Sequence, residues 1–337
     1  MLKAYTGTVG RRYKEESEKL IPDPYLHDYT KIILSKAFRR LSSKTQLITM
    51  PNNPHIRTRL IHTQDVIGVS VAIASQLGLN EHLCMAIAAG HDIGHTPYGH
   101  AGERALSKFG NKPFKHYVNS VVVAQHIERK GAGLNLTHET LNGILGHSRG
   151  DNKLAVGKDA IQEHSVVMFA DKIAYIFADA NDAVRYGFLK EEPNLLHDFG
   201  PTQIDRHMKI VAELVKESKE KGYVDFTESK AAQKFGELRT FMFDHVYSKI
   251  DWSLHETILW KLCEFFAKDV DLGIDPVLAV SLLTDREANH FATLLLNQKK
   301  PGIEEIKSWG VYEILPHIKG KKIDYSDPDL GWGKTKR

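Results

Sequence analysis

The chain has 337 residues, of which 42% are hydrophobic and 26% are charged, and its formal net charge is +3. This is the composition of a soluble globular protein, and the small net charge gives no sign of the strongly basic surface of a nucleic-acid-coating protein. The N-terminal residues lack the apolar centre of a signal peptide and no apolar run reaches the ~20 residues that span a bilayer, so we expect a cytoplasmic protein without a membrane partner.

The apolar residues recur at helical spacing along most of the chain, and strand-like alternation is scarce. In the first part, the pattern predicts helices over 28–41, 57–77, 81–93 and 115–130, a helix that begins near Thr137, and a long helix over 160–186. After Gly200-Pro201, it predicts helices over 204–222, 227–248, 254–270, 276–298 and 303–315, and an irregular tail from Lys319. We therefore predict an all-α fold, with a catalytic core at 1–200 and a C-terminal helical extension, 201–337, packed on it.

The chain contains few cysteines and many histidines. The two cysteines, Cys84 and Cys263, lie in apolar segments, so we expect buried free thiols in a reducing compartment rather than disulfides or a zinc site. Histidine occurs 18 times. Because histidine is the commonest metal ligand and titrates near neutral pH, the positions of these residues are informative.

Two histidines and two aspartates point to a metal site. His91 and Asp92 end a predicted helix that is otherwise almost wholly apolar, and buried carboxylates are normally paired or bound to metal. His62 and Asp171 lie in two further apolar helices. Each residue alone has an ordinary structural explanation, and the combination across three helices carries the inference. This mixed nitrogen and oxygen set suits Mn, Mg, Co, Ni, Fe or Zn rather than copper.

At these four positions the chain resembles the HD superfamily of metal phosphohydrolases. The surrounding residues resemble one branch, the deoxyguanosinetriphosphate triphosphohydrolases and their dNTP-hydrolysing relatives. The run H-D-I-G-H-T-P-Y-G-H-A-G-E at 91–103 is the most specific match. The resemblance covers roughly residues 30–190, and its other matching segments are 38–41, 44–46, 59–63, 133–137 and 171–175.

The resemblance implies an HD-domain helical bundle that hydrolyses a deoxynucleoside triphosphate to a deoxynucleoside and inorganic triphosphate. It implies a divalent metal held by His62, His91, Asp92 and Asp171. The same resemblance implies a homo-oligomer, either a hexamer or a dimer-based assembly, and a possible effector, either single-stranded DNA or a dNTP.

Three histidines are candidates for proton transfer, because an imidazole titrates near neutral pH. The resemblance favours His116 as catalytic and His95 as a phosphate contact, with His100 as the third candidate. Tyr117 follows His116 where relatives often carry Asn or an acid, so the sequence leaves the partner of His116 open.

Five residues are candidates for substrate binding. Arg59 and Lys172 are cations next to predicted metal ligands, where a triphosphate would need them. Tyr175 and Asp179 share one helix face with Asp171, and the resemblance implies that they contact the sugar ring and its 3′-hydroxyl. Gln46 matches a position that contacts the sugar or base.

Two other functions stay open at this point. An HD phosphohydrolase could act on a nucleoside monophosphate or a cyclic nucleotide, and His95, His116 and Asp179 could then supply ligands for a second ion. A catalytically silent nucleotide-binding regulator is the second alternative. All four ligand positions are filled, which argues against the silent protein.

Overall fold

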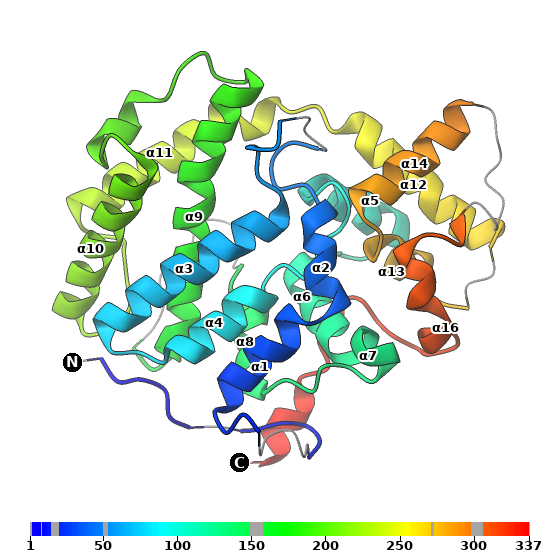
Figure 1. Cartoon of the computed structure of the whole chain (residues 1–337), viewed down its shortest axis with the longest axis horizontal. Coiled ribbons are helices and arrows are strands. Elements are labelled where there is room, and N and C mark those ends of the chain that lie inside the picture. Colours follow the sequence, from blue (N-terminus) through cyan, green and yellow to red (C-terminus); the bar gives the residue numbers. More distant parts are fainter. Residues whose placement is uncertain are drawn as a thin grey trace.

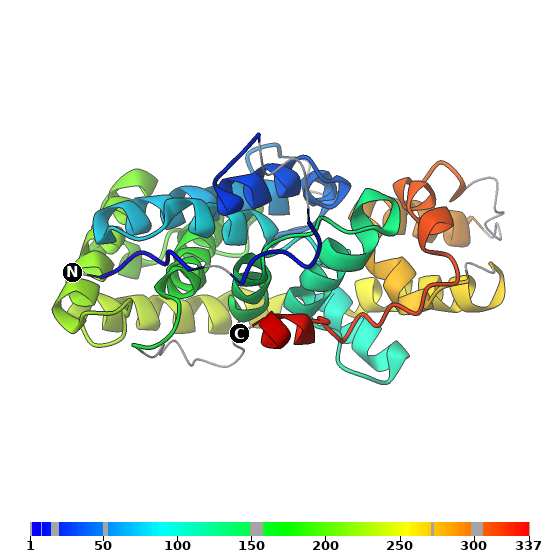
Figure 2. The ribbon, with the colours of Figure 1, turned by 90° about the horizontal axis from the view of Figure 1, so that it is seen from below.

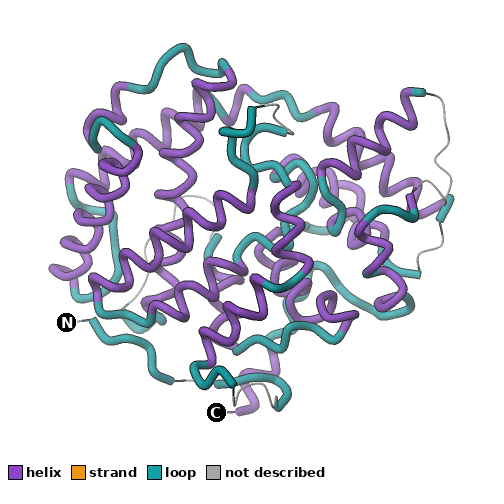
Figure 3. Tube along the Cα trace, in the orientation of Figure 1, coloured by secondary structure: helices purple, strands orange, loops and turns teal. Residues whose placement is uncertain are grey.

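The computed structural model describes residues 2–7, 9–14, 20–49, 53–148, 158–270, 273–297 and 306–336. Within these ranges the regular structure is helical, and β pairing is limited to two isolated bridges, Arg11 with Thr137 and Thr45 with Thr58 (Figure 3). The predicted all-α class is confirmed. None of the described helices combines the length and the apolar character that crossing a membrane requires.

The centre of the molecule is a group of four helices. They are α1 (Pro24–Ile33), α3 (Arg59–Leu77), α4 (Glu81–Gly90) and α9 (Gln162–Tyr186). Helix α3 packs against both α4 and α9, and α1 packs against α4 (Figure 1). Helix α4 is apolar on nearly every side because α8 (His138–Gly146) also packs against it. This arrangement buries the end of α4, where His91 and Asp92 follow.

Capping side chains divide two segments that the sequence predicts as single helices. Ser35 accepts a hydrogen bond from the Phe38 N–H (3.1 Å), so α1 ends at Ile33 and α2 begins anew over Lys36–Arg40. Similarly, Thr284 forms a capping box with Glu287. The predicted helix over 276–298 is therefore two helices, α13 (Pro276–Ser281) and α14 (Asp285–Leu296).

The segment 91–130 also departs from the prediction. A helix that the periodicity did not predict, α5 (His100–Gly110), begins directly after Gly99, whose φ is 58°. The predicted helix over 115–130 is three pieces, α6 (His116–Val122), the π-helix η3 (Val123–Ile127) and the short α7 (Glu128–Gly131). Short helices thus surround the histidine-rich motif.

The C-terminal half packs on the N-terminal half through several elements. They are α10 (Gln203–Lys221), α11 (Lys230–His245), the 3₁₀ turn η5 (Tyr247–Lys249) and α12 (Ser253–Lys268). Helix α10 packs against α3 and α9, while α12 packs against α5. Residues 303–305 of the predicted helix over 303–315 lie outside the described ranges. The rest forms η6 (Gly310–Glu313) and the start of α16 (Leu315–Ile318).

The tail returns to the N-terminal half of the chain. Trp332 donates a hydrogen bond from Nε1 to Gln125 Oε1 (3.1 Å), and Arg12 pairs with Asp329 (2.6 Å). Figure 2 shows the flattened molecule edge-on, with the red C-terminal segment running along its lower side. The predicted irregular tail is extended up to the 3₁₀ turn η7 (Gly331–Lys336).

Candidate active site

A cavity of about 680 Å³ lies among α3, α5, α6, α9 and α11. Eleven of the twelve site residues predicted from the sequence line it. The twelfth, His91, is only 1% exposed, and its Nε2 lies 3.3 Å from Asp92 Oδ2 and 3.9 Å from Asp171 Oδ1. The residues that line the cavity are Gln46, Arg59, His62, Asp92, His95, His100, His116, Asp171, Lys172, Tyr175 and Asp179.

The four proposed metal ligands come together from three helices. His62 belongs to α3, His91 and Asp92 follow α4, and Asp171 belongs to α9. Besides the contacts of His91, Nε2 of His62 lies 3.1 Å from Asp171 Oδ1. Ligand atoms at about 2.1 Å from an ion lie roughly 3 to 3.5 Å apart when they are adjacent and roughly 4 Å apart when they are opposite, so spacings of 3.1, 3.3 and 3.9 Å fit one cation.

The charge and hydrogen bonding of His91 and Asp171 also favour a bound cation. Nδ1 of His91 donates a hydrogen bond to the Ala88 carbonyl (2.7 Å), so Nε2 is the ring nitrogen that faces the carboxylates. That Nε2 is buried and has no hydrogen-bond partner among the described residues. Burial opposes ionisation of Asp171, but contacts with His62 and His91 outweigh it and hold the pKa of Asp171 below its usual range. A cation would satisfy the orphaned nitrogen and the charged carboxylate together.

Arg59 and Lys172 lie where the sequence predicts phosphate-binding cations. The buried Arg59 donates from Nε to the Thr45 carbonyl (3.0 Å) and pairs with Asp92 through its terminal nitrogen. Burial raises the pKa of Asp92, but His91 and Arg59 reverse this effect and keep that pKa well below its usual range. Lys172 lines the same cavity from α9. Arg59 therefore connects the cluster of proposed metal ligands to the cavity.

Gly94 allows the histidine motif to approach α6. A Cβ on Gly94 would lie 2.1 Å from the backbone nitrogen of Ser120. Gly94 N–H donates to Ser120 Oγ, and Ser120 Oγ donates to the His91 carbonyl, both at 2.9 Å. This close approach stacks the ring of His95 on the ring of His116, with centroids 4.4 Å apart and planes at 11°.

Glu103 is the partner of His116 that the sequence left open. Nδ1 of His116 donates to Glu103 Oε1 (2.7 Å), and Nδ1 of His100 contacts Glu103 Oε2 (2.8 Å). Burial would raise the pKa of Glu103, but His116 and His100 hold it well below its usual range. The carboxylate thus orients two of the three candidate histidines. Glu103 is the last residue of the motif at 91–103, so the motif itself contains the partner for His116 that Tyr117 does not provide.

His147 is a cavity residue that the sequence reasoning missed. Its Nε2 lies 3.3 Å from Nε2 of His116, and burial lowers the pKa of His147 to about 3. Gly146-His147 ends α8 as Gly90-His91 ends α4, and Nδ1 of each histidine donates to the carbonyl three residues earlier at 2.7 Å. The repeated Gly-His at a helix end was the signal that could have identified it.

The far side of the cavity is built by the C-terminal half. The hydroxyl of Tyr247 donates to Asp179 Oδ2 (3.0 Å), and the ring of Tyr247 meets that of Tyr175 edge-on, with centroids 6.4 Å apart. Burial raises the pKa of Asp179 to about 7. Arg239 and Trp252 also line this side. Sequence reasoning missed these residues because the family resemblance fades after about residue 190.

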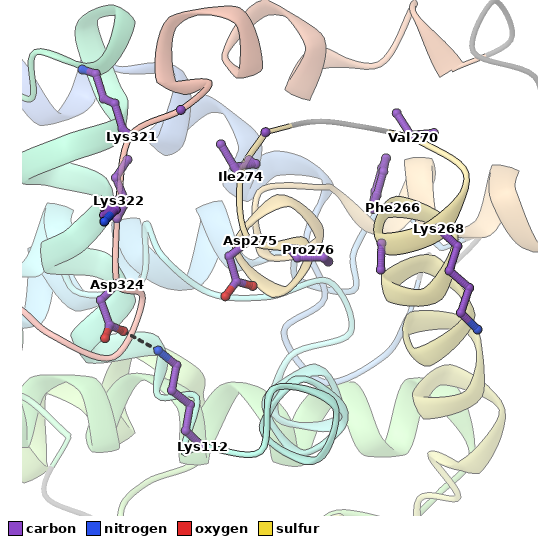
Figure 4. Close-up of a pocket in the computed structure, with 14 residues that line it drawn as sticks. Lys112, Phe266, Lys268, Val270, Ile274, Asp275, Pro276, Lys321, Lys322 and Asp324 are labelled. Atoms are coloured by element: carbon purple, nitrogen blue, oxygen red, sulfur yellow. Dashed lines mark hydrogen bonds and ion pairs between the residues drawn. The ribbon is translucent and has the colours of Figure 1, made fainter.

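A second cavity, of about 740 Å³, lies between the end of α12 and the segment 320–324 (Figure 4). Four lysines and two aspartates line it, and Lys112 pairs with Asp324 across it at 2.7 Å. None of the site residues predicted from the sequence contributes to this cavity. The chemistry predicted from the sequence is therefore concentrated in the first cavity.

Comparison with known proteins agrees with this geometry. Residues 59–176 match the HD domain family. Proteins named deoxyguanosinetriphosphate triphosphohydrolase-like are similar to most of the chain. The Clostridium tetani protein is 37% identical over 273 residues, 78% of each chain. The Caldanaerobacter subterraneus protein is 40% identical over 268 residues, 77% of each chain, and a Clostridium perfringens protein 42% over 247 residues, 71% of each. The chain belongs to the deoxyguanosinetriphosphate triphosphohydrolase-like family of HD-domain proteins.

Proposed function

We propose that the protein is a metal-dependent dNTP triphosphohydrolase, which releases a deoxynucleoside and inorganic triphosphate. One observation carries the proposal. The orphaned Nε2 of His91 is surrounded by His62, Asp92 and Asp171 at ligand spacing, at the wall of a cavity that also contains cationic side chains. The names of the similar proteins support the same activity.

In the proposed reaction, the oxygen of a water bonds to the α-phosphorus and the bond from that phosphorus to O5′ breaks. The attacking water gives up a proton, and O5′ receives one, so that the sugar leaves as a neutral alcohol. His62, His91, Asp92 and Asp171 would hold a divalent cation, which would lower the pKa of a coordinated water and polarise a phosphoryl oxygen. Mn, Mg, Co, Ni, Fe and Zn are all candidates for that cation.

The histidines beside this centre would move the protons. His116 is our proposed proton donor, because it lines the cavity, Glu103 fixes its Nδ1, and its Nε2 lies 3.7 Å from Asp92 Oδ1 beside the proposed metal ligands. Burial and the nearby Arg59 hold the pKa of His95 well below its usual range, so its ring is neutral, and we assign it to contact a phosphate oxygen. His100 shares Glu103 and is the alternative donor.

We assign the other residues that line the cavity to parts of the substrate. We assign Arg59 and Lys172 to the triphosphate, since charge-assisted contacts to phosphate oxygens are strong. We assign Tyr175 to the face of the sugar, where a ring close to C2′ would exclude a ribose hydroxyl, and Asp179 to the 3′-hydroxyl. Gln46 lines the cavity and is assigned to the sugar or base.

The test is a panel of four dNTPs and four NTPs with Mn, Mg, Co and Ni, with the products resolved by chromatography. We expect inorganic triphosphate and a deoxynucleoside. Release of orthophosphate, or opening of a cyclic phosphate, would favour another HD phosphohydrolase activity. Tight binding of dNTPs without turnover under every metal would favour the silent regulator. Homo-oligomerisation and a DNA or dNTP effector stay predictions from the family resemblance, and a cytoplasmic location stays a prediction from the composition of the sequence.

A further inference from the structure

A turn beside the candidate active site has an unfavourable backbone conformation. Tyr98 has a φ of 58°, and Gly99, the next residue, has the same φ. Glycine adopts this left-handed region freely, but a bulky aromatic residue stays there only where its surroundings hold it. The turn lies between His95 and His100, with which α5 begins. Its conformation therefore helps to set where two of the three candidate histidines lie.

The buried side chain of Asp285 is bonded to this turn and to a second segment of the site. Asp285 is the first residue of α14, which is orange in Figure 1. Its Oδ1 accepts from the Tyr98 N–H (3.0 Å), and its Oδ2 accepts from both the N–H (2.9 Å) and the hydroxyl of Thr45. The Thr45 carbonyl in turn accepts from Arg59 Nε (3.0 Å). One carboxylate thus joins the turn to the segment that contacts Arg59.

Two further side chains bond the same part of the site to the C-terminal half. Asn289, one helical turn further along α14, accepts from the Tyr98 hydroxyl at Oδ1 (2.7 Å). Lys44 donates from Nζ to the carbonyl of His95 and to that of Ser281, the last residue of α13 (3.1 Å to Ser281). Neither of these side chains nor the buried carboxylate lines the cavity. They can influence a reaction there only through the residues that they hold.

We propose that Asp285, together with Asn289, is a positioning residue for the proposed reaction. The two side chains hold the Tyr98 turn and the segment at Thr45 in the geometry that presents the candidate histidines to the substrate. The inference rests on the proposed function, because it concerns the placing of groups which that function uses. A carboxylate suits the role because its two oxygens accept all three hydrogen bonds.

An amide at position 285 would not replace the carboxylate. It has one oxygen, so its NH₂ group must face either the Tyr98 N–H or the donors of Thr45. A buried N–H that loses its acceptor disfavours the conformation in which it is buried. Asp285→Asn therefore removes support from the turn or from the neighbouring segment while it keeps the shape of the side chain.

The experiment compares Asp285→Asn with the wild type as full chains loaded with Mn²⁺, on the dNTP that the wild type hydrolyses fastest. We expect kcat for triphosphate release to fall about tenfold or more, since a misplacement of about 1 Å can cost ~10²-fold in rate. We expect KM to change by about threefold or less, because Lys172, Tyr175 and Asp179 belong to α9 and not to the turn. Manganese per chain, measured by elemental analysis, should not change.

Glu217→Gln is the matched control. Glu217 is a buried carboxylate on α10 that also accepts three hydrogen bonds through its two oxygens, without lining the cavity. Its donors are the N–H groups of Thr227 (2.8 Å), Glu228 (2.9 Å) and Ser229 (3.1 Å). We expect this variant to lose stability and to keep the wild-type kcat. An equal loss of kcat in Glu217→Gln would overturn the proposal, and so would the wild-type kcat in folded Asp285→Asn.

Asn289→Leu decides the question if Asp285→Asn does not fold, as judged by circular dichroism. This variant removes the acceptor of the Tyr98 hydroxyl and leaves the carboxylate in place. We expect the same pattern, a lower kcat with a smaller change in KM. An unchanged kcat in this variant would overturn the proposal.

A measurement that needs no activity separates this proposal from the proposed function. Hydrogen–deuterium exchange over residues 94–100, followed by mass spectrometry, should be faster in Asp285→Asn than in the wild type and unchanged in Glu217→Gln. Unchanged exchange in Asp285→Asn would overturn the proposal. A wild-type protein that releases no triphosphate would remove the proposed function, and the exchange data would still decide whether Asp285 holds the turn.

Discussion

Asp179 offers a sharp test of the electrostatics of the cavity. Asp179 is 4% exposed, and burial raises the pKa of its carboxyl group from 3.8 to about 7. The folded protein therefore binds a proton at Asp179 in a pH range where the unfolded chain has released it. Stability contributed by this proton is fully present below about pH 4 and is lost as the pH rises to about 7. Over that window the loss is about 4 kcal/mol, at ~1.4 kcal/mol for each pH unit.

The Asp179→Asn variant removes this dependence, because an amide does not titrate and its oxygen can still accept from the Tyr247 hydroxyl. The measured quantity is the free energy of unfolding of the variant minus that of the wild type. We expect this difference to increase by up to about 4 kcal/mol between pH 4 and pH 8, because only the wild type loses stability over that range. Urea unfolding of the chelator-treated protein at both pH values measures this difference. The exposed Asp244→Asn is the control and should show no such change. An equal wild-type-to-variant difference at pH 4 and pH 8 would refute the buried, protonated Asp179.

Four further changes test the site. His91→Ala and Asp171→Ala should abolish cation binding and turnover with unchanged helical content, as measured by elemental analysis and circular dichroism. Tyr175→Ala should bring kcat/KM for an NTP closer to that for the matching dNTP. Glu103→Gln should slow turnover by roughly 10²-fold or more, because His116 and His100 lose their carboxylate partner. Gly94→Ala should lower the unfolding free energy by about 2 kcal/mol or more, since its Cβ meets the Ser120 backbone.

Each of these predictions has an outcome that would contradict it. Activity retained in either ligand variant would remove the proposed metal centre, and unchanged sugar selectivity would remove Tyr175 from that role. Wild-type turnover in Glu103→Gln would show that the carboxylate contact does not serve proton transfer. Wild-type stability of Gly94→Ala would show that the motif can move away from α6.

The candidate site residues of the N-terminal half could be predicted from the sequence because they occur in short contiguous motifs on helices with strong hydrophobic periodicity. Buried His91 and Asp92 stand out against an apolar helix, and Tyr175 and Asp179 follow Asp171 at helical spacing. His147 was not found because the Gly-His pair at the end of its helix is a weak signal until it is compared with Gly90-His91. Its significance depends on the position of His116, which lies 31 residues away in sequence and 3.3 Å away in space.

The residues that the C-terminal half contributes to the cavity could not be predicted from the sequence, for a different reason. Arg239 and Tyr247 occur in ordinary amphipathic sequence, and their packing against α9 is a long-range tertiary contact that periodicity does not encode. Helix breaks were missed where a single side chain decides them. Ser35 and Thr284 act by capping, and either residue is also tolerated inside a helix. At both positions the capping hydrogen bond begins a new helix, although the hydrophobic pattern continues through it and predicts a single helix.

The central claim is that three helices deliver two imidazoles and two carboxylates to one cation. Anomalous diffraction from crystals of the wild-type protein soaked in Mn²⁺ tests it most directly. The claim predicts a manganese peak within bonding distance, about 2.0 to 2.3 Å, of His62, His91, Asp92 and Asp171. A strong manganese peak elsewhere in the molecule, with these four side chains making no contact with any ion, would contradict it.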